Sequence, residues 1–154
     1  MTMLICAFAM GVVAGLRTMT APAAVSWAAR LGALPVGDTG LAVLGYAWTP
    51  WILTLLALGE YVADQWPSTP SRTVPVQFAG RVLSGAFCGA AIGAASASMA
   101  AGAAAGAVGA VVGTLGGRAA RGRLASAFGR DRPAAFIEDG VAVGAAALIV
   151  GALA

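Results

Sequence analysis

The sequence predicts an all-α integral membrane protein. Of its 154 residues, 60% are hydrophobic and only 10% are charged, and the mean hydropathy is +0.87. A soluble domain usually carries about 25% charged residues, which it needs to cover its surface. Five segments approach the roughly 20 apolar residues that cross a bilayer core of about 30 Å. We therefore expect one transmembrane domain of about five helices over residues 1–154.

The expected spans are separated by short polar or Gly/Pro-containing connections. The first is not expected to be a signal peptide, because no positive charge precedes its apolar run. The second opens at Thr49-Pro50, where proline suits the first helical turn, and Trp48 and Trp66 flank it as interfacial rings do. The expected spans are 3–29, 48–66, 78–96, 102–118 and 134–154.

Residues 78–117 are almost wholly small and apolar. A single helix of this length would extend about 60 Å, twice the bilayer core, so we expect a hairpin that turns near residues 96–102. Glycine recurs every four residues in both arms, which allows helix backbones to approach closely. This pattern favours helix packing, inside the bundle or at a dimer seam; a small-residue face lining a pore is the alternative. The glycines are Gly85, Gly89, Gly93, Gly109, Gly113 and Gly117.

Arg17 stands deep inside the first apolar segment. A charge at that depth costs about 2.5–3.5 kcal/mol on insertion scales, so it is normally kept with a partner or a function. Thr20-Ala21-Pro22 follows it, and we expect a helix break there, with Thr20 as N-cap of a second half-helix that begins near Pro22. The N–H groups of such a half-helix, beside Arg17, would form an anion site. A simple kink with a structural ion pair is the alternative.

Acidic residues in two other segments are candidate partners of Arg17. Glu60 and Asp64 share one face of the second span. The expected depths of Arg17 and Glu60 in the membrane differ by a distance that an extended arginine side chain can bridge, so we predict an ion pair between them. Asp64 is either part of the site or a solvated helix end. Glu138 and Asp139 point about 100° apart on a helix, so only one can face the bundle fully. Pairing with nearby arginines or capping the helix start is their alternative role.

A short internal similarity favours inverted two-helix repeats. Gly15-Leu16-Arg17 precedes the span that carries Glu60, and Gly116-Gly117-Arg118 precedes the span that carries Glu138. One span separates the two pairs, which gives them inverted topology, as in many transporters. If the five spans cross the membrane in alternating directions, the loop arginines lie on the same side of the membrane as the N-terminus, except Arg30, which lies on the opposite side. The positive-inside rule then predicts a cytoplasmic N-terminus and an external C-terminus.

Several functions are not supported by the residues present. The chain has no histidine, and Cys6 and Cys88 are isolated in apolar runs. We therefore expect no metal site, no haem, no other cofactor and no disulfide, and we expect both cysteines to be packing residues. The arginines form no basic-aromatic cluster, so nucleic acid is not an expected partner.

Four motifs resemble those of a family of small bacterial inner-membrane proteins that is classed as a domain of unknown function. They are the stretch from Gly15 to Pro22, Gly59-Glu60-Tyr61-Val62-Ala63-Asp64, Pro70-Ser71-Arg72-Thr73 and Glu138-Asp139-Gly140. The resemblance covers nearly the whole chain. It implies a polytopic inner-membrane protein and supplies no substrate or activity.

The function that we predict is transport of a small solute or ion through the bilayer by a carrier or channel-like protein, which we expect to form a homo-oligomer, a homodimer. An anionic solute would be held by Arg17 and the half-helix end, while Glu60 takes up a coupling proton. A structural or accessory protein, with Arg17–Glu60 as an ion pair, is the alternative; an enzyme acting on lipid or isoprenoid phosphates is less favoured, because no metal motif or nucleophile is found. The expected site residues are Arg17, Thr18, Thr20, Glu60, Asp64, Glu138 and Asp139.

Overall fold

The computed structural model describes residues 1–64 and 73–154, and for residues 131 and 132 only the backbone. Trp66, Arg72 and most of the predicted connection 67–73 lie outside the described residues. In the described ranges the chain is helical and has no strand. The elements are α1 (Thr2–Leu16), α2 (Thr20–Arg30), the 3-10 turn η1 (Ala42–Gly45), α3 (Thr49–Ala63), α4 (Pro75–Ala94), α5 (Met99–Phe128) and α6 (Asp131–Leu153).

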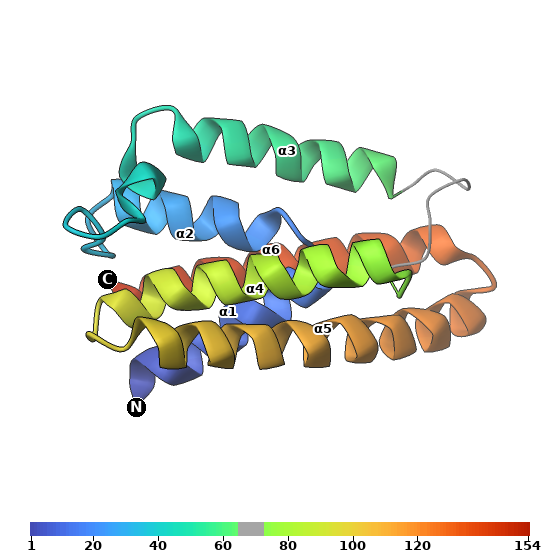
Figure 1. Ribbon diagram of the computed structural model, residues 1–154. Coiled ribbons are helices and arrows are strands. Elements are labelled where there is room, and N and C mark those ends of the chain that lie inside the picture. The colour runs from blue at the N-terminus through green and yellow to red at the C-terminus, as the bar shows by residue number, and fades with distance from the viewer. Residues whose placement is uncertain (65–72) are drawn as a thin grey trace.

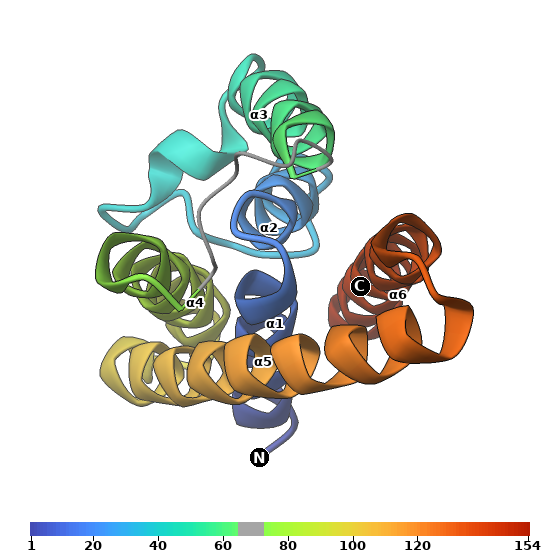
Figure 2. The ribbon, with the colours of Figure 1, turned by 90° about the vertical axis from the view of Figure 1, so that its right-hand side faces the viewer.

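The first apolar segment is a re-entrant pair of helices. α1 runs from the end of the bundle that carries the N-terminus toward the middle, and α2 returns to that same end (Figures 1 and 2). Their 15 and 11 residues correspond to lengths of about 22 and 16 Å, each shorter than a bilayer core of about 30 Å. The prediction of a broken helix that crosses over residues 3–29 is therefore wrong. The segment breaks, but it turns back.

The turn between α1 and α2 lies earlier in the sequence than the break that we predicted from Pro22. α1 ends at Leu16, and Arg17 has extended backbone angles, with φ −140° and ψ 116°. α2 begins at Thr20 with Met19 as its N-cap, so Thr20 is not the cap. Pro22 falls in the first turn of α2, where its missing N–H breaks no helical hydrogen bond. Non-helical residues between the two helices allow the reversal, which a proline kink alone would not.

The remaining four helices run along the bundle in alternating directions (Figure 1). Because the first pair turns back, the N-terminus and the C-terminus lie at the same end of the bundle. The prediction that the termini lie on opposite sides is therefore wrong, because it counted the first segment as one crossing. Among the described residues, three helical stretches are long and apolar enough to cross a membrane: Pro75–Ala94, Met99–Phe128 and Pro133–Leu153. α1 and α3 are shorter apolar helices.

Glycines bring α1, α4 and α5 into backbone contact. A Cβ on Gly106 would overlap the carbonyl oxygen of Gly85, and one on Gly89 would overlap that of Gly102. Gly109 and Gly113 of α5 meet α1 in the same way, at the carbonyl oxygens of Phe8 and Val12. The prediction that these glycines serve helix packing is confirmed, and the contacts lie between helices of one chain.

The central hairpin has the predicted form with a longer second arm. α4 ends at Ala94 and α5 begins at Met99, close to the expected turn. α5 then continues ten residues beyond the predicted end at 118, to a left-handed Gly129 with φ +64°, a conformation that glycine adopts without strain. α5 is unbroken at Arg118, whereas the chain breaks at Arg17. The predicted inverted repeat therefore has no structural counterpart.

Candidate functional site

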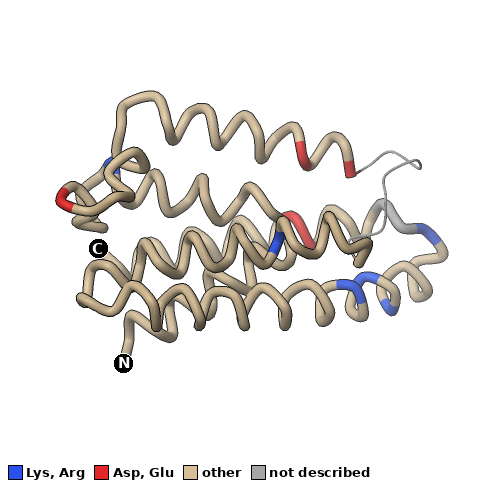
Figure 3. Tube along the Cα trace, viewed as in Figure 1, with Lys and Arg blue, Asp and Glu red and all other residues tan. Residues whose placement is uncertain are grey.

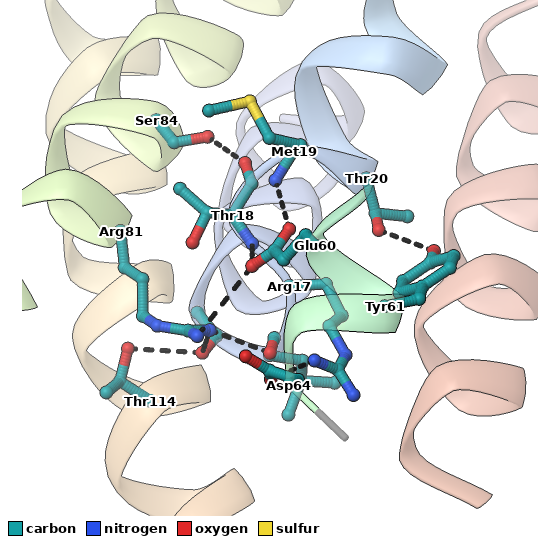
Figure 4. Close-up of polar contacts among 12 residues, drawn as sticks. Arg17, Thr18, Met19, Thr20, Glu60, Tyr61, Asp64, Arg81, Ser84 and Thr114 are labelled. Carbon is teal, nitrogen blue, oxygen red and sulfur yellow. Dashed lines mark hydrogen bonds and ion pairs between the residues drawn. The ribbon is translucent and has the colours of Figure 1, made fainter. Parts of the chain in front are cut away.

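The tip between α1 and α2 exposes backbone polar groups inside the bundle, and charged side chains satisfy them. At the start of α2 the N–H groups of Thr18 and Met19 donate to the two carboxylate oxygens of Glu60, each at 2.8 Å (Figure 4). A carboxylate is the group that the positive end of a helix favours. Ser84 of α4 donates its hydroxyl to the Thr18 carbonyl at 2.6 Å. Glu60 therefore occupies the donors that the sequence assigned to a solute.

The end of α1 is capped by a second buried arginine. Nη1 of Arg81, on α4, donates to the carbonyl oxygens of Gly15 at 2.9 Å and Leu16 at 2.7 Å. The hydroxyl of Thr114, on α5, adds a donor to Gly15 at 3.2 Å. A cation suits the negative end of a helix. Nη2 of Arg81 is also 3.8 Å from Oε1 of Glu60, so the two capping groups form an ion pair across the tip.

Arg17 is fully buried and is held by two carboxylates. Its guanidinium pairs with Asp64 at the end of α3 and with Asp139 of α6. The guanidinium carbon lies 5.4 Å from the centroid of the Tyr61 ring, within the range of a cation–π contact. Tyr61 in turn shares a hydrogen bond of 2.7 Å with the Thr20 hydroxyl. Three helices thus fix the position of one buried charge.

The structure brings together most of the predicted site residues, in different pairs. The predicted contact between Arg17 and Glu60 is wrong: Arg17 pairs with Asp64 and Asp139 instead. The reversal of the first segment causes the error, because the predicted depths assumed that this segment crosses the bundle. Glu138 lies outside the tip, where its Oε2 is 3.5 Å from Nη1 of Arg121. Asp139 contacts Arg17, whereas Glu138 is buried against a nearby arginine, which is the alternative role predicted for these acids.

Sequence reasoning missed Arg81, Tyr61, Ser84 and Thr114. Arg81 stands in an apolar segment, as Arg17 does, and it is 3% exposed. The same insertion cost that singled out Arg17 could have found it. No sequence pattern indicated that the hydroxyl groups of Ser84 and Thr114 contact the tip. Serine and threonine are common in apolar helices, where their hydroxyl groups usually bond to the backbone of their own helix.

Two hollows flank the tip on either side of α3. One, of about 420 Å³, reaches the backbone at Thr18 and Met19 and the carboxylate of Glu60, and Gln77 of α4 lines its other wall. The other, of about 470 Å³, is mostly apolar and lies between α2, α3 and α6, with Thr20 and Tyr61 at its lining. The first hollow gives Glu60 open space beside its hydrogen-bonded position.

These features define a class of protein: a helical bundle with a re-entrant helix pair whose tip is held by charged side chains. Comparisons with protein-family models, with curated proteins and with solved structures found no match. The family resemblance of the motifs stays a prediction.

Proposed function

We propose that the chain is an integral membrane protein and that the re-entrant tip is the site through which it transports a small anion in exchange for, or together with, a proton. The apolar helices α4, α5 and α6 support the membrane setting. Non-helical backbone at membrane depth is tolerated where it is buried in protein or lines a cavity. The tip fits this rule, since the backbone N–H and C=O groups of Thr18, Met19, Gly15 and Leu16 are bonded within the bundle and one side adjoins a hollow.

The observation that carries the proposal is the position of the Glu60 carboxylate. It binds the N–H groups of Thr18 and Met19 near a buried arginine, which is how a protein binds a small anion. A solute anion entering from the adjoining hollow competes with Glu60 for the same donors. Protonation removes the charge of Glu60 and weakens its hold on them. Anion entry and proton uptake are thereby linked at one carboxylate.

The charges around the tip support an exchangeable proton. Two arginines, Arg17 and Arg81, face three carboxylates, Glu60, Asp64 and Asp139. The arginine side chains are 0% and 3% exposed, while the three carboxylates are 14–16% exposed. With every group ionised the cluster carries one surplus negative charge, which is costly in a low-dielectric setting and is removed by one proton. The coupled group is therefore a carboxylate that solvent can reach.

Glu60→Gln is the test of this mechanism. The glutamine keeps the size of the side chain but carries neither the negative charge nor the exchangeable proton. In liposomes we expect wild-type protein to move a halide or nitrate with a measurable proton flux. The variant should still move the anion while its proton-to-anion ratio falls to zero. Asp38→Asn, in an exposed loop, is the matched control and should retain coupling. If wild-type protein moves no anion and no proton under either gradient, the proposal fails.

The structural alternative has one observation in its favour. Arg17 already has two acidic partners within the chain, Asp64 and Asp139. In that case the ion pairs would only fix the register of the helices. A variant with Arg17→Met, Asp64→Asn and Asp139→Asn that folds and sustains any cellular phenotype as wild type does would favour this alternative over transport.

We further propose that the end of the bundle opposite the termini faces the cytoplasm. Figure 3 draws the described arginines of α5 and its following turn at that end. Arg30 is the last residue of α2, which ends at the end that carries the termini (Figure 1). The cytoplasmic excess of arginine in membrane proteins supports this orientation. It reverses the predicted position of the N-terminus and leaves the C-terminus outside.

Cysteine labelling checks the orientation. Asp38→Cys and Arg130→Cys introduce single exposed thiols at opposite ends of the bundle. The native Cys6 and Cys88 are buried, so they should give little background. In intact cells a membrane-impermeant maleimide should label position 38 and should reach position 130 only after permeabilisation. The opposite pattern would contradict the proposed orientation.

A further inference from the structure

We infer that the C-terminal part of α5, which extends past α3 and α4 (Figure 1), is a binding surface for the headgroup of an anionic phospholipid. The inference rests on the proposed membrane location, and it is independent of the transport mechanism. The surface is a shallow, open hollow along one face of α5, lined by Leu115, Arg118, Ala119, Gly122, Arg123 and Ser126. We call it the basic hollow.

In the part of the chain that the structure describes, the arginines of the basic hollow have no acidic partner. Arg118 and Arg123 are exposed, and the hydrogen bond of Arg118 goes to the Thr73 hydroxyl at 3.2 Å. Neither forms an ion pair with any acid in the described part of the chain. Arg121, on another side of the same helix, pairs with Glu138. α5 therefore presents an unneutralised positive face next to one that is neutralised internally.

The small residues of the hollow leave room for a bulky anion between the two guanidinium groups. A Cβ on Gly122 would meet nothing within 4 Å, and Ala119 and Ser126 are similarly short. Guanidinium groups bind phosphate oxygens in a bidentate manner. Two arginines around an open, small-residue floor thus suit a phosphodiester.

The position of the hollow along α5 matches the headgroup layer. From Met99 to Arg118 the helix advances about 28 Å, close to the thickness of a bilayer core. Leu115 then lies just inside the core and Arg123 about 8 Å outside it. The apolar end of the hollow faces acyl chains while the basic end meets headgroups. A free phosphate would use only the second of these, so the geometry favours a lipid.

Lipid retention in detergent and in nanodiscs tests the inference. We expect wild-type protein from mixed phosphatidylglycerol–phosphatidylcholine bilayers to retain phosphatidylglycerol selectively, as measured by native mass spectrometry. Arg118→Gln/Arg123→Gln should lose at least about tenfold of that selectivity, because each charge contributes separately to attraction by an anionic surface. Higher salt should weaken the selectivity of the wild type, since the site is exposed.

Arg30→Gln, the exposed arginine at the opposite end of the bundle, is the matched control and should leave the selectivity unchanged. Equal retention of both lipids by wild type and by the double variant overturns the inference. So does displacement of the lipid by soluble glycerol phosphate at similar concentration, which would indicate a plain phosphate site. Glu60→Gln should bind phosphatidylglycerol as wild type does, so a failure of transport and a failure of lipid binding are distinguishable.

Discussion

Arg17→Met is expected to lower the free energy of unfolding by about 3 kcal/mol. Removing one partner of a buried ion pair leaves an uncompensated charge, with typical costs of about 3–5 kcal/mol. Here two carboxylates, Asp64 and Asp139, lose their cation together. Their side chains are 16% and 15% exposed, so solvent reduces the penalty to the lower end of that range. Denaturant unfolding in detergent micelles, followed by tryptophan fluorescence, measures the change.

The added substitutions Asp64→Asn and Asp139→Asn should recover much of this loss, because they remove the two stranded negative charges. Arg30→Met, at the exposed end of α2, serves as control and should change the stability by less than about 0.5 kcal/mol. Wild-type stability in Arg17→Met alone would contradict the arrangement of charges at the tip.

Gly106→Ala is expected to destabilise the bundle by about 2–3 kcal/mol, or to prevent folding. Overpacking of a well-packed core typically costs about 1–3 kcal/mol. At Gly106 the added methyl group meets the carbonyl oxygen of Gly85 and the Cα atom of Gly89. These obstacles are backbone atoms, which cannot rotate away as a side chain can. The loss should appear as a lower thermal midpoint and a smaller monodisperse fraction in size-exclusion chromatography.

Gly116→Ala provides the comparison on the same helix. No atom lies within 4 Å of a Cβ at this position, and alanine is favoured over glycine in helices by about 1 kcal/mol. We therefore expect this variant to be as stable as the wild type or slightly more stable. A similar loss in both variants would contradict the close-packing explanation, because helix propensity favours alanine at both positions.

The sequence carried enough information to predict the helical class, the glycine contacts and the importance of Arg17. Each of these follows from a local property: the hydropathy of a window, a spacing of four residues, or the cost of one charge in an apolar run. The central hairpin was predicted from length alone, since a helix over residues 78–117 is too long for one crossing. Such features do not depend on the path of the rest of the chain.

The partners of Arg17 could not be predicted in the same way. Whether Glu60, Asp64 or Asp139 meets it depends on the direction in which α2 leaves the tip, and a three-residue break permits either a crossing or a return. The return places Glu60 over the backbone N–H groups and leaves Asp64 and Asp139 for the guanidinium. Tertiary contacts with α3, α4 and α6 decide between the two paths, and those contacts have no local signature.

The order of these contacts along the chain has a consequence for biogenesis. Every charged group that holds the tip, from Glu60 through Arg81 to Asp139, follows the tip in the sequence. When α1 and α2 are synthesised, their end groups and Arg17 have no partner with which to enter an apolar medium. In the proposed membrane setting, the ion pair between Arg17 and Asp139 can therefore form only after α6 has been made, although the tip is made first.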